Sequence, residues 1–183
     1  MLNNGRTRLF AALGALTLFP AVASAADYTY VEGGFIDRHD YGQTGPGGRI
    51  AGSFDLPVLP LAIIAEYTGT DNLDQFDVGA IFHVPIIPTL NLFGGATLEH
   101  GDRNDGDTST GIGARAGVRW QTTGNLELSP ELRYTHLFGS NETSVRLNAL
   151  YNIAPHLDLQ GAIQGGDEQR YEVGMRYNFG LHL

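Results

Sequence analysis

The sequence predicts an all-β protein that folds as a closed antiparallel up-and-down transmembrane β-barrel of ten strands. Apolar and polar residues alternate with a period of two in ten successive segments, which is typical of strands with one apolar and one polar face. Most of these segments have eight to eleven residues, close to the length that a tilted strand needs to cross a bilayer. The connections alternate between short turns and longer polar stretches, which indicates two different rims.

The first half of the chain contributes five predicted strands. In the fourth, apolar residues from Phe76 to Val84 alternate with Asp77 and His83, so that one face is apolar and the other polar. The five ranges are Tyr28–Ile36, Arg49–Leu56, Leu61–Thr68, Phe76–Val84 and Leu90–Glu99.

The second half contributes five more. In the last, Tyr177 and Phe179 fall on the apolar face and Arg176 on the polar face. An even number of strands places both termini at one rim. Merging neighbouring segments would give eight strands, and that alternative stays open. The ranges are Gly111–Gln121, Leu126–Leu137, Ser144–Ile153, Leu157–Gln164 and Glu172–Phe179.

The connections predict which rim is which. The short set is rich in proline and glycine, as expected for periplasmic turns, and the other set is polar and often longer, as expected for outer loops. The short set is Pro57–Pro60, Pro85–Pro88, Thr122–Asn125 and Ala154–His156. The longer set is Asp37–Gly48, Gly69–Gln75, His100–Thr110, Phe138–Thr143 and Gly165–Gln169.

Aromatic residues near both ends of the strands predict two girdles at the membrane interfaces. The periplasmic girdle would contain Tyr28, Phe54, Phe82, Trp120, Tyr151, Tyr177 and Phe179. The outer girdle would contain Phe35, Tyr67, Phe76, Tyr134, Phe138 and Tyr171.

The N-terminus has the pattern of a cleaved export signal. Arg6 and Arg8 precede an apolar run from Leu9 to Val22, and Ala23-Ser24-Ala25 forms an A-x-A cleavage site. Cleavage is predicted before Ala26, so residues 1–25 are the signal peptide and 26–183 the barrel domain. The apolar run is shorter than the roughly 20 residues of a transmembrane helix.

Composition excludes several function classes. The chain has 183 residues, no cysteine and a formal net charge of −9, and all 11 of its basic residues are arginine. Thiolate chemistry and disulfides are therefore excluded, and nucleic acid, which requires a cationic surface, is not an expected partner. No cofactor is indicated.

The polar face of the strands predicts a charged lumen. The first five predicted strands carry only acids inward, and most of the arginines follow on the sixth to eighth, so that two arcs of opposite charge face each other. An ion-pair plug that neutralises buried charge is the first interpretation. A narrow pore, whose excess of acids would favour cations, is the alternative. The predicted network is Glu32, Asp55, Glu66, Asp77, Glu99, Arg115, Arg119, Glu131, Arg133, Arg146, Asp158, Glu172 and Arg176, with Glu127 also facing inward.

Candidates for catalysis and metal binding are weak. His136 and Ser140 lie at a strand end, where a lipid-modifying hydrolase would place them, but no third residue is indicated to orient a base. His83 is expected inside the barrel, close to Asp77. The acidic loop Gly101–Asp107 has oxygen ligands but lacks the spacing of a calcium motif, so no metal site is predicted.

Two terminal strands carry a family resemblance. The pattern of Gly174, Tyr177 and Phe179 in the last strand looks like the C-terminal assembly signal of outer-membrane barrels. The chain resembles the small Gram-negative outer-membrane β-barrel proteins of the OmpA-like and OmpX-like group, and its opening Tyr28–Phe35 resembles the first strand of a xanthomonad-type small-barrel family. It departs from many members by continuing four residues beyond Phe179.

The resemblance implies location in the bacterial outer membrane and a monomer. Its implied partners are outer-membrane lipid, lipopolysaccharide and the barrel assembly machinery, and it implies no catalytic residues. A soluble lipocalin-like barrel would show the same alternation. The absence of lysine, the aromatic girdles and the last strand favour the membrane barrel.

Overall fold

A computed structural model describes residues 27–40, 43–56 and 58–180 of the chain. The predicted signal peptide, residues 1–25, and its cleavage site lie outside the described residues. Ten β-strands are present: β1 (Tyr30–Asp40), β2 (Gln43–Asp55), β3 (Leu61–Thr70), β4 (Leu73–Ile87), β5 (Leu90–Arg103), β6 (Thr108–Thr123), β7 (Leu126–Leu137), β8 (Ser140–Ala154), β9 (Leu157–Gly166) and β10 (Gln169–Asn178). The described residues form no helix with the length and apolar character needed to cross a membrane.

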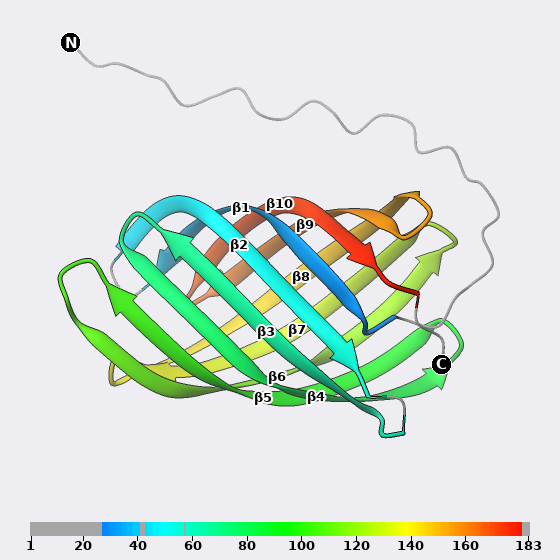
Figure 1. Ribbon diagram of the computed structural model, residues 1–183, viewed down its shortest axis with the longest axis horizontal. Coiled ribbons are helices and arrows are strands. Elements are labelled where there is room, and N and C mark those ends of the chain that lie inside the picture. Colours follow the sequence, from blue (N-terminus) through cyan, green and yellow to red (C-terminus); the bar gives the residue numbers. More distant parts are fainter. Residues whose placement is uncertain (1–26, 41–42, 57, 181–183) are drawn as a thin grey trace, which may run out of the picture.

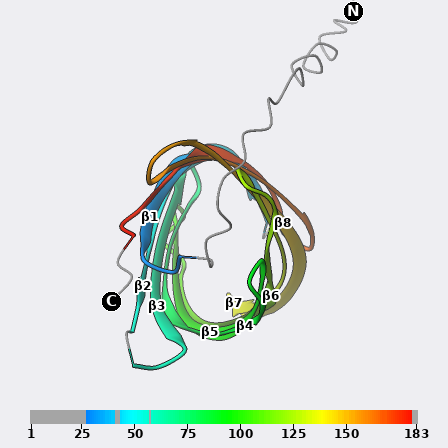
Figure 2. The same cartoon turned by 90° about the vertical axis from the view of Figure 1, so that its right-hand side faces the viewer.

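Each strand pairs with its neighbours in the chain, and β1 pairs with β10 to close the barrel. The closing register runs from Tyr30 opposite Asn178 to His39 opposite Gln169, and all pairs are antiparallel. Figures 1 and 2 show the tilted strands wound into a single closed wall. The prediction of a ten-stranded up-and-down barrel is confirmed, and the eight-stranded alternative is wrong.

The two ends of the barrel differ. We call the end where β1 begins and β10 ends the terminal rim, and the other end, which carries the turns at 71–72, 104–107, 138–139 and 167–168, the distal rim. The sequence predicted long outer loops at the distal rim. That prediction is wrong, because the strands continue into the predicted loop ranges. For example, β5 reaches Arg103 and β6 begins at Thr108, and the two remain paired out to Asp102 and Thr108. Continuing the ladder satisfies backbone N–H and C=O groups that a loop would leave unpaired.

One predicted turn is also strand. Pro85 lies inside β4, where the register with β5 shifts between Pro85 and Ile87. A bulge at this point accommodates a proline, which lacks the N–H that a regular ladder requires.

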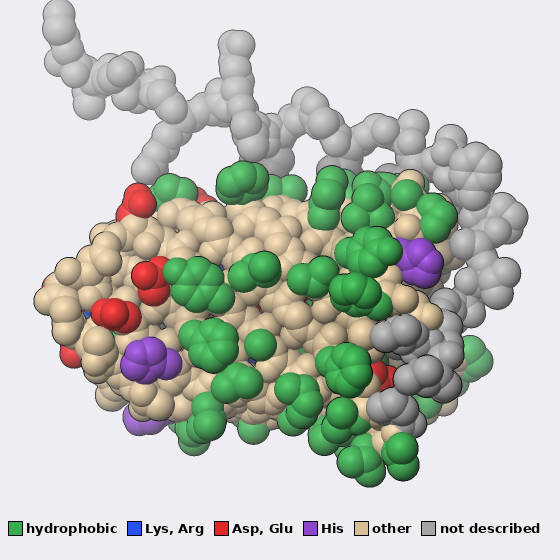
Figure 3. All heavy atoms as spheres, in the orientation of Figure 1, with side chains coloured by type: hydrophobic (Ala, Val, Ile, Leu, Met, Phe, Trp, Pro, Cys, Tyr) green, Lys and Arg blue, Asp and Glu red, His purple; other side chains and the backbone are tan. Residues whose placement is uncertain are grey.

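The outer surface is apolar along the strands. Phe35 is 78% exposed and Leu98 is 62% exposed, and similar side chains project from every strand. Figure 3 shows hydrophobic side chains over the middle and right of the barrel, with acidic side chains mostly at the left, distal end. Tyr28, predicted for the periplasmic girdle, is instead 3% exposed and packs inside with Ala62, Ile64, Ile81 and Phe93.

Glycines permit close contact between β4 and β5. A Cβ atom at Gly79 would lie 2.1 Å from the Ala96 carbonyl oxygen, and one at Gly95 would lie 2.2 Å from the Ala80 carbonyl oxygen. No other residue type fits here without a shift of the backbone. Such positions let a barrel wall bend sharply.

Candidate functional site: the charged interior

The polar faces of the strands meet in an interior crowded with charge. The side chains of the predicted network lie there, and all are buried or nearly so except Asp55, whose side chain is 38% exposed. The ladder fixes these positions, because alternate residues along each strand point inward.

Glu66 on β3 is the hub of this interior. Its carboxylate accepts a hydrogen bond from Arg49 Nη2 at 2.9 Å and one from Arg170 Nη1 at 3.2 Å. Arg133 Nη2 approaches it to 3.7 Å. Since β4, β5 and β6 lie between β3 and β7 on the shorter way round the wall, the contact with Arg133 crosses the interior.

Two further glutamates, Glu172 and Glu32, add ion pairs to those of Glu66. Glu172 accepts hydrogen bonds from both terminal nitrogens of Arg146, the Nη2 bond measuring 2.7 Å, and lies 3.7 Å from Arg49 Nη1. Glu32 is 2.7 Å from Arg49 Nη1 and accepts a 2.7 Å hydrogen bond from Arg176 Nε. Paired guanidinium and carboxylate groups of this kind give the strongest hydrogen bonds in proteins.

Four interior charges were missed by the sequence analysis. Arg38 and Glu168, 3.2 Å apart, lie in segments assigned to outer loops. Arg170, which donates to Glu168 at 2.7 Å, lies between the predicted loop Gly165–Gln169 and the predicted strand Glu172–Phe179. Arg49 is the first residue of a predicted strand but was not assigned to a face. It lies two residues before Ala51, on the same face as Ser53 and Asp55. Continuing the alternation by two residues from Ile36 and from Glu172 would have found Arg38 and Arg170, whereas Glu168 lies in the turn between β9 and β10.

These residues overturn the prediction of opposed acidic and basic arcs. Arg38 and Arg49 lie on β1 and β2, among strands predicted to carry only acids inward. Opposite charges are instead interleaved, because each buried charge needs a partner within hydrogen-bond reach. We call this set the interior ion-pair network: Glu32, Glu66, Glu131, Glu168 and Glu172 with Arg38, Arg49, Arg133, Arg146, Arg170 and Arg176.

The terminal rim is filled by the segment that precedes β1. The ring of Tyr28 stacks on His83 with centroids 3.9 Å apart, and the Arg119 guanidinium lies 4.6 Å from its centroid. Arg119 also donates to both oxygens of Glu127, at 2.8 and 3.0 Å, and to the Asp27 carbonyl at 2.6 Å. His83 bonds Asp55 at 2.9 Å, not the expected Asp77.

Asp77 and Glu99 form a pair of a different kind. They lie opposite each other on β4 and β5, and Gln75 Nε2 donates to both, at 2.9 and 3.3 Å. Among the described residues, no arginine forms an ion pair with either carboxylate. Asp158 is likewise held by amides, with Asn152 at 2.8 Å and Asn178 at 2.7 Å.

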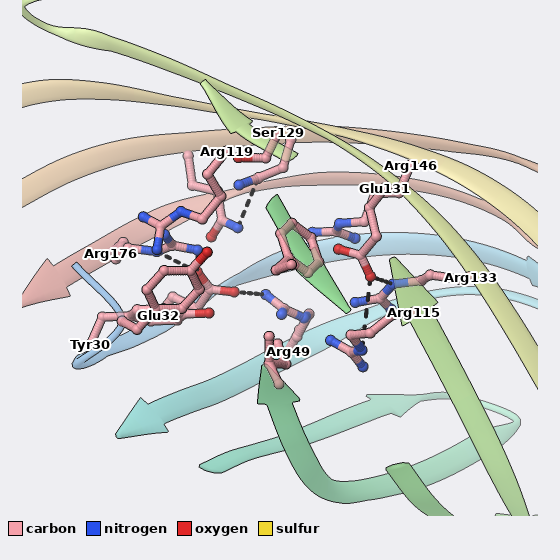
Figure 4. A pocket seen from close by; sticks show the side chains of 15 residues that line it. Tyr30, Glu32, Arg49, Arg115, Arg119, Ser129, Glu131, Arg133, Arg146 and Arg176 are labelled. Carbon is pink, nitrogen blue, oxygen red and sulfur yellow. Dashed lines mark hydrogen bonds and ion pairs between the residues drawn. The ribbon is translucent and has the colours of Figure 1, made fainter. Parts of the chain in front are cut away.

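A cavity of about 60 Å³ lies within the interior (Figure 4). Figure 4 shows arginines from several strands converging on it, together with Glu32 and Glu131. Its charged lining is Glu32, Glu131, Arg49, Arg115, Arg119, Arg133, Arg146 and Arg176.

The candidate residues for catalysis and for metal binding do not form a site among the described residues. His136 is exposed, and its Nδ1 bonds the Asn141 side chain at 2.7 Å; within the described part of the chain no hydrogen bond joins it to Ser140. In the loop Gly101–Asp107, Arg103 lies 3.4 Å from Asp107. The described residues contain no group of three or more His, Cys, Asp or Glu side chains that could hold a metal ion.

Comparison with known proteins identifies the fold but no family. No family model matches the chain, and no curated protein matches it. Solved structures do. The KdgM porin has a TM-score of 0.52 at 14% identity, with 82% of this chain and 99% of that one covered. A further match is the same porin in complex with disordered oligogalacturonate, with a TM-score of 0.51.

Two further solved structures, a channel and a second porin, have a similar fold. An outer membrane channel from Pseudomonas putida F1 has a TM-score of 0.52 at 12% identity, covering 89% of this chain and all of that one. The NanC porin has a TM-score of 0.50 at 12% identity and covers 82% and 100%. The narrower resemblance to the OmpA-like and OmpX-like group stays a prediction. This chain has the fold of outer-membrane β-barrels, and the neighbours that show it are named as porins and channels.

Proposed function

We propose that this chain is a monomeric, non-enzymatic outer-membrane barrel whose lumen is closed by ion pairs and whose role is structural or an interaction at the cell surface. The observation that carries the proposal is the contact of Arg133 with Glu66 across the interior. It connects the pairs of Arg133 with Glu131 and of Arg49 with Glu66 and Glu172, so that charge is neutralised from wall to wall.

The apolar outer surface supports location in the outer membrane. Residues 1–25 would direct export, and the barrel assembly machinery would recognise Gly174, Tyr177 and Phe179 in β10. Acidic side chains at the distal rim would share divalent cations with lipopolysaccharide phosphates. These rim acids are Asp71, Asp74, Asp102, Asp105, Asp107, Glu142 and Asp167.

Single-channel recording in planar bilayers tests the closed lumen. The refolded barrel, checked by heat-modifiable migration on a gel, is expected to give no conductance steps. A variant with both Glu66→Ala and Arg133→Ala, which removes the side chains that meet across the interior at no net change of charge, is expected to conduct. Steady steps from the unaltered protein would contradict the proposal.

A narrow cation-preferring pore is the second candidate, because Asp77 and Glu99 are interior carboxylates with no arginine partner among the described residues. A pore lined by unpaired acids favours cations. Asp77→Asn is then expected to lower the cation-to-anion permeability ratio, measured from the reversal potential in a salt gradient. Asp107→Asn at the distal rim makes the same charge change outside the lumen. Equal ratios for both variants and the unaltered protein would exclude this candidate.

A further inference from the structure

The interior cavity of Figure 4 is lined by charged side chains that are mainly cationic. Its charged lining comprises six arginines and two glutamates, although the chain as a whole is acidic. We propose that this cavity is a binding site for a small planar oxyanion of the carboxylate class.

The acceptors that line the cavity are already engaged. Glu32 is held by Arg49 and Arg176 through its two different oxygens, at 2.7 Å in each case. Glu131 accepts a 2.7 Å hydrogen bond from Arg133 Nε. A cation entering the cavity would have to compete with arginine for each of these carboxylates.

Some hydrogen-bond donors that line the cavity, by contrast, have no acceptor among the described residues. Arg49 Nε is buried and has no hydrogen-bond partner in the part of the chain that the structure describes. Arg115 makes one contact among the described residues, an ion pair with Glu131 at 3.8 Å, and no hydrogen bond. Asn148 accepts a hydrogen bond from Gln160 at 3.1 Å through its oxygen, and its NH₂ group donates no hydrogen bond to the described residues. These donors come from β2, β6 and β8, and all three residues line the cavity.

Unused cationic donors facing a cavity favour an anion. A buried N–H donor without an acceptor is costly, and a bound anion supplies the missing acceptors. The planar fork of arginine matches the two oxygens of a carboxylate. The volume of about 60 Å³ admits a few water molecules or one small ion, and excludes a sugar acid.

The test compares two sodium salts. Thermal unfolding of the refolded full barrel in detergent is followed in sodium formate and in sodium gluconate at equal sodium concentration. Formate is expected to raise the midpoint of unfolding with a saturating dependence on concentration, because a ligand that binds only the folded state stabilises it. Gluconate, which is too large for the cavity, is expected to leave the midpoint unchanged.

Arg115→Gln is the diagnostic variant, because Glu131 keeps its bond to Arg133 when Arg115 is lost. Its apparent affinity for formate is expected to fall at least tenfold. Arg103→Gln removes the same charge near the distal rim, outside the cavity lining, and is expected to respond as the unaltered protein does. Equal effects of formate and gluconate, or equal losses in both variants, would overturn the proposal.

A direct measurement keeps the proposal testable if Arg115→Gln does not fold. The line width of ¹³C-labelled formate is recorded with the unaltered barrel. Broadening that disappears on addition of excess unlabelled formate, but not gluconate, is expected. No broadening over the concentration range of the unfolding experiment would overturn the site.

Discussion

Glu66→Gln is expected to lower the free energy of unfolding by about 3–5 kcal/mol, the range for removing one partner from a buried ion pair. The carboxylate of Glu66 is the shared partner of Arg49, Arg133 and Arg170. Glutamine has the same size and keeps one acceptor, so the loss would come from charge left unneutralised inside the barrel. Urea unfolding in lipid vesicles, followed by tryptophan fluorescence from Trp120, measures the change.

Asp102→Asn provides the control for this experiment. It removes one negative charge at the distal rim, where Asp102 is exposed, and its effect is expected to stay within about 0.5 kcal/mol. If Glu66→Gln were no more destabilising than Asp102→Asn, the interior of the barrel would be hydrated enough to solvate its own charges, and the closed-lumen proposal would fail with it.

Gly79→Ala is expected to cost about 3 kcal/mol, the upper part of the range for inserting atoms into a packed site, and to reduce the refolded yield. The added Cβ would lie 2.1 Å from the Ala96 carbonyl oxygen. That atom belongs to the backbone of the paired strand, so relief requires β4 and β5 to move apart. Heat-modifiable migration reports the folded fraction, and urea unfolding reports the stability.

Gly161→Ala is the control for Gly79→Ala, because it makes the same substitution in another strand. Gly161 also lies within a strand, β9, but a Cβ there meets no atom within 4 Å. Its stability is expected to be unchanged or slightly higher, because alanine reduces the conformational freedom of the unfolded chain. A cost equal to that of Gly79→Ala would show that loss of glycine itself, rather than the close approach of two strands, is responsible.

The alternation of residue types was sufficient to predict the strands and most of the interior. Glu66, Arg133 and Glu172 were assigned inward from parity alone, because the side chains of a strand alternate without exception unless a bulge intervenes. The limits arose at strand ends. Arg38 was missed because it fell in a predicted loop, and Arg170 because the last strand was begun at Glu172, whereas the ladder continues and pairs the two residues.

Partners across the barrel could not be predicted. The contact of Arg133 with Glu66 depends on strand tilt and on the stagger between β3 and β7, and neither quantity is encoded in the pattern of a single strand. Tyr28 is a different case. It was assigned to the girdle from its place near a strand end, although it shares the parity of the inward-facing Glu32, and the chain before β1 turns inward beneath Arg119.

The seam between β1 and β10 also determines the order in which the barrel is built. Nine of the strand pairings of the barrel join strands that are consecutive in the chain, so each closes a short loop. The tenth, between β1 and β10, must bring Glu32 to Arg176 over a separation of 144 residues. Loop-closure entropy makes such a contact late. The pairs of Glu172 with Arg146 and Arg49, and of Arg170 with Glu66, form only when β10 is in place. The ion pairs that join β10 to β2 and β3 are therefore expected to form in the last step, so that the pairing with the longest loop to close also brings together charges from the two ends of the chain.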